Sequence, residues 1–227
     1  GYHVAGIMKD EKAYQHVDPA LVGNSSRVLV SELSGQRNLT MKLEEQGIDY
    51  PFTQDEIKKL LELVKEKESQ GYQYEGAEAS FELLVRRALP SYHQPFELED
   101  FVIVERRRQS HVREQLNEML AEAMVKVKVD GVTHHTAAEG NGPVNALDAA
   151  VRKALVAAYP AVDDVKLVDY KVRILDSQAA TGARVRVLIE STDGARYWTT
   201  VGSSTDIIEA SWLALADAFE YALTPAG

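Results

Sequence analysis

Cysteine is absent from the 227 residues, and this absence removes several kinds of site at once. A chain without cysteine has no disulfide bonds, no zinc–thiolate centre and no thiol nucleophile. Long apolar runs are missing too, because no stretch approaches the roughly 18 apolar residues of a membrane-spanning helix. No signal peptide is recognisable. We therefore expect a soluble, cytoplasmic chain with no membrane partner.

Positive charge is also scarce. The chain has 25 Lys and Arg against 35 Asp and Glu, which gives a net charge of −10. Binding to a phosphate backbone needs a clustered basic surface. The one basic cluster, Arg106-Arg107-Arg108, is short and ends an apparent strand, as is typical of a solvated edge. No nucleic-acid partner is expected.

Common catalytic and metal motifs are missing as well. No nucleophile-elbow sequence accompanies a Ser-His-Asp set. Gly140-Asn141-Gly142 lacks both the Lys-Ser/Thr tail of a phosphate loop and the dinucleotide spacing. His134 and His135 are neighbours in a strand-like pattern, so they point to opposite faces and cannot chelate one ion together. We expect no metal site in this chain.

The most informative stretch runs from residue 138 to 159 and predicts a strand, a glycine loop and a helix. Gly140 and Gly142 flank Asn141, and the backbone of such a loop can adopt φ > 0 and lie open to a ligand. Pro143 suits the first turn of the helix. Exposed N–H groups at such a helix start suit a carboxylate or phosphate. The alternative is an ordinary strand–helix turn with no ligand.

Two hairpins share one pattern. Apolar residues alternate from Met124 to Val129 and again from Val185 to Ile189. Asp130-Gly131 follows the first run and Asp193-Gly194 the second, and Asp-Gly is a strong hairpin signal. The offset between the two turns is 193 − 130 = 63 positions.

The helix after each hairpin repeats too. Residues 202–206 form a second small-residue loop, and Ile207 to Leu223 predicts a second helix. Shifting the apolar stripe of the first helix by 64 positions, the offset between Ala146 and Ala210, lands on an almost wholly apolar face of the second. We infer an internal duplication, with repeats at about 121–160 and 165–224.

These repeats predict the fold class. Two hairpin-plus-helix units, each apolar on one face, must cover one another, so we expect an α+β, two-layer module with pseudo-two-fold symmetry. Such a module often dimerises through a self-complementary surface. Residues 96–108 look like a strand buried on both faces. Residues 110–120 read as a loop or a frayed helix.

Residues 1–95 read as a mostly helical linker region, with residues 96–227 as the second domain. The boundary is placed near Gln94-Pro95. Helices are expected at 39–46, capped by Gly47, at 53–71 after a capping box, and at 77–89. The linker has no core large enough for a catalytic domain.

Four motifs in order resemble the C-terminal part of the 2-isopropylmalate synthase and citramalate synthase family. They are Gly1 to Asp10, Val22-Gly23, Ser31-Glu32-Leu33-Ser34-Gly35, and Gly140-Asn141-Gly142-Pro143-Val144. The resemblance covers essentially the whole chain. Ser31 to Gly35, Ala79 to Leu84 and Ile207 to Trp212 are most similar to the citramalate synthase branch.

The resemblance implies an enzyme that condenses acetyl-CoA with a 2-oxo acid, using a divalent metal in a TIM barrel. The chain has no barrel and no initiator Met, so we expect a fragment that is inactive alone and holds no cofactor. His3 and Tyr14 match the His and Tyr that the family's linker lends to the active site of the neighbouring subunit. Ala5 departs from the acidic residue that some relatives carry there.

The duplicated module would then be an allosteric dimerisation domain that binds an end-product amino acid. Isoleucine is the effector in the citramalate branch and leucine in the isopropylmalate branch. An amino acid needs donors for its carboxylate, acceptors for its ammonium group and an apolar pocket. The candidate effector residues are Gly140, Asn141, Gly142, Pro143, Val144, Asn145, Leu147, Ile207 and Ile208. Leu147 and Ile208 are equally compatible with plain core positions. A stand-alone amino-acid-sensing or dimerising module is the alternative from another class.

Overall fold

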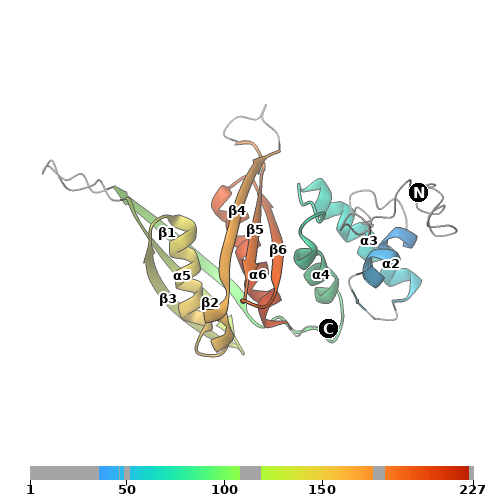
Figure 1. Cartoon of the computed structure of the whole chain (residues 1–227), viewed down its shortest axis with the longest axis horizontal. Helices are drawn as coiled ribbons and strands as arrows, with labels where there is room; N and C mark the ends of the chain where they lie inside the picture. Colours follow the sequence, from blue (N-terminus) through green and yellow to red (C-terminus); the bar gives the residue numbers. More distant parts are fainter. Residues whose placement is uncertain (1–35, 46, 49–51, 108–118, 176–181, 225–227) are drawn as a thin grey trace, which may run out of the picture. The chain divides into compact units, whose positions relative to one another are not determined.

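The computed structural model describes residues 36–45, 47–48, 52–107, 119–175 and 182–224 (Figure 1). His3 and Tyr14, and the motifs between residues 1 and 35, lie outside the described residues. The chain divides into two compact units between Gly76 and Ala77. Within the described residues, no helix combines the length and the apolar character needed to cross a membrane.

The first unit contains α2 (Gln36–Glu45) and α3 (Gln54–Ser69). Gly47 ends α2 with φ 65°, and its N–H donates to the carbonyl oxygen of Glu44 at 3.0 Å, which confirms the expected glycine cap. The capping box of α3 is also confirmed. The Thr53 N–H donates to Glu56 Oε2 at 2.8 Å, and the Glu56 N–H donates to Thr53 Oγ1 at 3.3 Å.

The second unit begins with α4 and continues as two sheets, each followed by a helix. Each sheet has three antiparallel strands, in the orders β1-β2-β3 and β4-β5-β6. The elements are α4 (Glu78–Arg87), β1 (Glu97–Arg107), β2 (Met119–Val129), β3 (Val132–Gly140), α5 (Pro143–Leu155), the short 3₁₀ helix η3 (Pro160–Asp164), β4 (Lys166–Ile174), β5 (Val185–Thr192), β6 (Tyr197–Ser204) and α6 (Ile207–Leu223). The α+β prediction is therefore confirmed. Helix α4 lies in this unit, although its sequence pattern had placed it with the linker.

Strand register shows the duplication directly. Ala121 pairs with Gly140 in the first sheet, and Val185 pairs with Ser204 in the second, 64 positions later in both strands. Each repeat also contains a further strand: β1, which the pattern of residues 96–108 predicted, and β4, which the sequence analysis missed. A register shift follows Leu98 in β1, and an equivalent one follows Leu167 in β4. Each repeat is thus a βββα unit.

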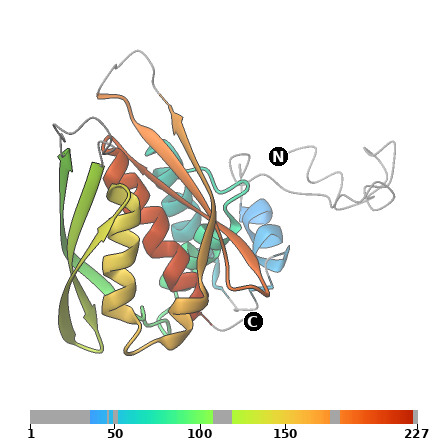
Figure 2. The ribbon, with the colours of Figure 1, turned by 60° about the vertical axis from the view of Figure 1, so that its left-hand side comes forward.

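Both repeats contribute to one hydrophobic core. Helices α5 and α6 lie side by side and run in the same direction, so both start at the same end of the unit (Figures 1 and 2). The Phe101 ring lies 6.1 Å from that of Trp212, and the Arg152 guanidinium lies 5.0 Å from the Phe219 ring centre. These contacts join the first repeat to α6, as expected for units that cover each other.

Alanine and glycine bring each helix close to its sheet. Ala146, Ala150 and Ala154 of α5 are at most 1% exposed. On the second repeat, a Cβ at Gly202 would overlap the Ala210 carbonyl group, so only glycine fits between β6 and α6. Tight strand–helix packing is therefore built into both repeats.

Three local expectations are corrected. Val102 and Val104 are 46% and 38% exposed, so β1 is buried on one face only, as in an antiparallel sheet with one solvated side. Met119 and Leu120 belong to β2 rather than to a loop. Gly202 to Ser204 are buried residues of β6, which leaves Thr205-Asp206 as the second loop.

Candidate functional site

The predicted glycine loop is shorter and more regular than expected. Strand β3 runs through Gly140 and α5 begins at Pro143, so only Asn141 and Gly142 connect them. Gly142 has φ 171°, which is extended backbone, and Gly140 is not among the glycines with positive φ. Neither glycine therefore uses the positive φ that glycine allows. N-cap residues usually have such an extended backbone conformation.

Gly140 is needed for space rather than for backbone freedom. A Cβ there would lie 2.7 Å from Asn145 Oδ1 and 2.8 Å from the Ala146 Cα. The first turn of α5 therefore packs directly on the end of β3. The Asn145 side chain also holds the loop, because its Oδ1 accepts a hydrogen bond from the Asn141 N–H at 3.1 Å.

The N-termini of the two equivalent helices differ in chemistry. Asp206 caps α6, where its Oδ1 accepts from the N–H groups of Ile208 at 2.7 Å and Glu209 at 3.3 Å. The equivalent residue 64 positions earlier is Gly142, which caps α5 without any side-chain hydrogen bond. The start of α5 can therefore accept an external carboxylate, whereas Asp206 already supplies one to α6.

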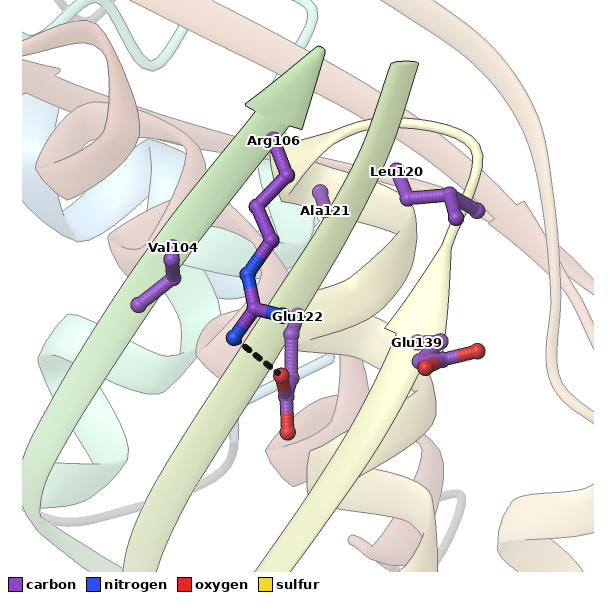
Figure 3. A pocket seen from close by; sticks show the side chains of 6 residues that line it. All are labelled: Val104, Arg106, Leu120, Ala121, Glu122 and Glu139. Carbon is purple, nitrogen blue, oxygen red and sulfur yellow. Dashed lines mark ion pairs between the residues drawn. The ribbon is translucent and has the colours of Figure 1, made fainter. Parts of the chain in front are cut away.

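A small pocket lies near the end of β3 on the solvent face of the first sheet, whereas α5 covers the opposite face (Figure 3). Its lining comes from three neighbouring strands and consists of Val104, Arg106, Leu120, Ala121, Glu122 and Glu139. Arg106 Nη2 lies 4.0 Å from Glu122 Oε2, and Glu139 directly precedes Gly140. The cavity holds about 40 Å³, which is room for water rather than for a branched side chain.

The predicted apolar contacts fall in different environments. Leu147 is fully buried in the core, whereas Val144 is half-buried in the first turn of α5. Ile207 is 45% exposed and Ile208 is half-buried, both in the first turn of α6. The two helix starts lie at the same end of the unit (Figure 2). Leu147 packs as a core residue, and the assignment of all nine positions to an effector site stays a prediction.

A larger pocket of about 200 Å³ lies between α4 and the start of β6, away from these residues. It is lined by Glu78, Ala79, Glu190, Tyr197, Trp198, Thr199 and Tyr221. Burial raises the pKa of the Tyr221 hydroxyl, and Glu82 adds to that shift. None of the predicted site residues lines this pocket.

Sequence reasoning also missed a buried polar cluster on α6. Ser80 Oγ donates to Asp217 Oδ2 at 2.6 Å, and Arg87 Nη2 donates to Asp217 Oδ1 at 2.6 Å and to Glu220 Oε2 at 2.7 Å. Burial raises the pKa of the Asp217 carboxyl. Burial alone would lower the pKa of Arg87, but Asp217 and Glu220 raise it overall. The sequence did contain one signal of this cluster: Asp217 and Glu220 fall on the apolar stripe of α6, where buried acids need partners.

Adjacent histidines behave as the strand pattern predicted. His134 pairs with Val127 and His135 with Lys126, so their side chains occupy opposite faces of the first sheet. Among the described residues, no group of three His, Asp or Glu side chains is placed to hold a metal ion.

Comparison with known families agrees with this architecture. Residues 75–223 match the LeuA allosteric (dimerisation) domain, which covers α4 and both repeats. The chain belongs to the LeuA allosteric (dimerisation) domain family. Residues 1–72 match the homocitrate synthase post-HMGL domain-like family. The chain therefore combines a post-HMGL region with a LeuA allosteric domain, as the motif resemblance implied.

Curated relatives of this LeuA-type chain are (R)-citramalate synthases. Those of Aquifex aeolicus and Geobacter sulfurreducens are 46% and 48% identical over 98% of the chain. The enzyme of Streptomyces coelicolor is 43% identical over 100% of it. The chain spans about two fifths of the length of these relatives, 41% of the first two and 42% of the third. It corresponds to their C-terminal region.

Proposed function

We propose that this chain is the linker and allosteric dimerisation region of an (R)-citramalate synthase, and that it binds isoleucine for feedback inhibition. One observation carries the proposal: the chain aligns over 98% of its length, at 46% and 48% identity, with two (R)-citramalate synthases. The whole enzyme would condense acetyl-CoA with pyruvate in isoleucine biosynthesis. The divalent metal and acetyl-CoA would bind in a TIM barrel outside this chain, and His3 and Tyr14 would reach that active site.

The start of α5 supports the binding part of the proposal. The Val144 and Asn145 N–H groups lie in the first turn of a helix whose N-cap, Gly142, has no side-chain hydrogen bond. Those groups and the helix dipole suit the carboxylate of an amino acid. Because Asp206 occupies the equivalent position on α6, one effector carboxylate is expected per chain.

The pocket near the end of β3, on the sheet face opposite α5, is too small for the effector's side chain in one chain. A second copy would have to complete it, consistent with the dimerisation named in the family description. Val102 and Val104 lie exposed on the same sheet face as the pocket and would contribute apolar surface. The proposed assembly is therefore a homodimer whose effector site closes at the subunit contact.

Calorimetry of the chain with isoleucine, leucine and valine tests this function. The proposal expects saturable binding with isoleucine preferred, and no acetyl-CoA turnover by the chain alone. Preference for leucine would instead assign the chain to a 2-isopropylmalate synthase. A folded dimer that binds none of the three would leave only a dimerising or stand-alone role and would reject the effector proposal.

A further inference from the structure

The segment before the first repeat is attached to the second repeat. Helix α4 leads towards β1, yet it packs against α6 and β6 (Figure 2). Beyond α4, Tyr92 Oη and Gln94 Nε2 donate to Glu220 on α6 at 2.9 and 3.0 Å. The chain then enters β1 of the first sheet. We call residues 78–95 the bridging segment, because they join α6 to the sheet of the other repeat.

Ser80 is the point where three elements of this unit meet. Its Oγ accepts a hydrogen bond from the Val201 N–H of β6 at 2.9 Å and donates to Asp217 Oδ2 of α6 at 2.6 Å. A hydroxyl has one proton, so donation to Asp217 fixes the direction of both bonds. Strand β6 is an edge of its sheet, and Ser80 satisfies one of its N–H groups.

Arg87 connects the same helix to two carboxylates. Its Nη2 bridges Asp217 and Glu220, and its Nε donates to Glu220 Oε1 at 3.0 Å. The carboxylate side chains are 12% and 2% exposed, whereas that of Arg87 is 32% exposed. The Glu220 carboxylate accepts four hydrogen bonds, from Arg87, Tyr92 and Gln94. Every donor comes from the bridging segment.

Such a cluster is better suited to fixing position than to adding stability. The attraction within a buried ion pair is largely offset by the loss of hydration, so its net contribution to folding is small. Its geometric demand is high, because the planar guanidinium fork matches carboxylates only in particular positions. Any shift of α6 therefore has to move Arg87, and with it the bridging segment.

We propose that the cluster of Ser80, Arg87, Asp217 and Glu220 couples the position of α6 to α4 and the rest of the bridging segment, through which the chain enters the two repeats, with Arg87 as the main positioning residue. This inference rests on the proposed function. The cluster contacts neither the start of α5 nor the residues predicted to bind the effector. It acts on the transmission of the effector signal, and effector affinity itself is set elsewhere in the domain.

The test uses the full-length enzyme and the present chain, with isoleucine as the probe. The factor by which saturating isoleucine weakens pyruvate binding measures coupling in the enzyme, and calorimetry measures isoleucine affinity in the chain. Allosteric coupling factors are commonly about 5- to 150-fold. Arg87→Met should bring the factor below about twofold, while the dissociation constant for isoleucine stays within about twofold of the wild type. A residue with only a structural role would weaken binding and coupling together.

Arg86→Met is the matched control, because Arg86 is the neighbouring cation on α4 and pairs with Glu82 of the same helix at 2.6 Å. This variant should keep full coupling. Ser80→Ala gives a second test if Arg87→Met does not fold, and it should also lower coupling. Variants that fold, bind isoleucine and keep wild-type coupling would overturn the inference. Absence of isoleucine binding by the wild-type chain would reject the proposed function instead.

Discussion

Thr136 Oγ1 donates a hydrogen bond to the carbonyl oxygen of Ala150, which joins β3 to α5 at 2.7 Å. The same bond recurs at the equivalent positions of the second repeat, where Thr200 Oγ1 donates to the Ala214 carbonyl oxygen, again at 2.7 Å. In both repeats the hydroxyl sits mid-strand on the face that the helix covers. The duplication therefore extends to individual side-chain contacts as well as to topology.

Removing either hydroxyl should destabilise the domain by a similar mechanism. In Thr136→Val and Thr200→Val the methyl packing is kept and the strand–helix bond is lost, so each should lower the free energy of unfolding by about 0.5–1.5 kcal/mol. Thr200 is fully buried and Thr136 only half-buried, so the Thr200 variant should lose more. Urea denaturation followed by circular dichroism measures both. An unchanged free energy of unfolding in either variant would contradict the claim that both hydroxyls stabilise the strand–helix packing.

Two glycines at the strand–helix junctions should respond differently to alanine. A Cβ at Gly202 meets the Ala210 and Ala214 backbone of α6, so Gly202→Ala should cost about 1–3 kcal/mol through overpacking. Gly142 has extended backbone, and a Cβ added there would have no other atom within 4 Å, so Gly142→Ala should cost less than about 1 kcal/mol. Thermal unfolding of both variants compares them. Equal losses of stability in the two variants would show that Gly202 does not pack tightly against α6.

Acid should weaken the β5–β6 turn through Asp193. Its carboxylate accepts hydrogen bonds from the Arg196 and Ala195 N–H groups, which lower its pKa from 3.8 to about 2. Because the folded pKa is depressed, the unfolded chain binds this proton first as pH falls, and the contribution is present above about pH 4 and lost towards pH 2. Asp193→Asn keeps an acceptor oxygen but does not titrate.

The stability difference between wild type and Asp193→Asn should therefore shrink as pH falls from 5 to 2, in urea denaturation at fixed salt. The carboxyl of Asp169 offers a comparison with that of Asp193. The side-chain hydrogen bond from Lys171 lowers the pKa of Asp169 too, although neither side chain of that pair is buried. A difference that stays constant across this range would show that the turn does not depress the pKa of Asp193.

Periodicity predicted the helices and hairpins well. Helix α6 has the predicted bounds, and Asp130-Gly131 has the positive φ values, 49° and 80°, that its turn needs. The third strand of each repeat was not matched, because the register shifts of β1 and β4 are offset by 167 − 98 = 69 positions, while the other strands are offset by 64. A comparison at one fixed offset cannot align them.

The site was harder to predict than the fold. The sequence alone does not show whether a glycine is needed for a positive φ or because a Cβ would not fit. Gly140 is needed because a Cβ would not fit. Arg87 and Asp217 are 130 residues apart in the chain, so their ion pair depends on tertiary packing alone. The sequence shows that Gly142 and Asp206 differ in chemistry. Only the structure shows that both residues are helix N-caps at equivalent positions.

The most direct test of the account is calorimetry of isoleucine with wild type and Gly142→Asp. Aspartate at this N-cap would reproduce the arrangement of Asp206 on α6, so the variant should fold at least as stably as the wild type. Its own carboxylate would then occupy the N–H groups at the start of α5, and isoleucine binding should be lost. Wild-type affinity in a folded Gly142→Asp chain would contradict the claim that α5 receives the effector.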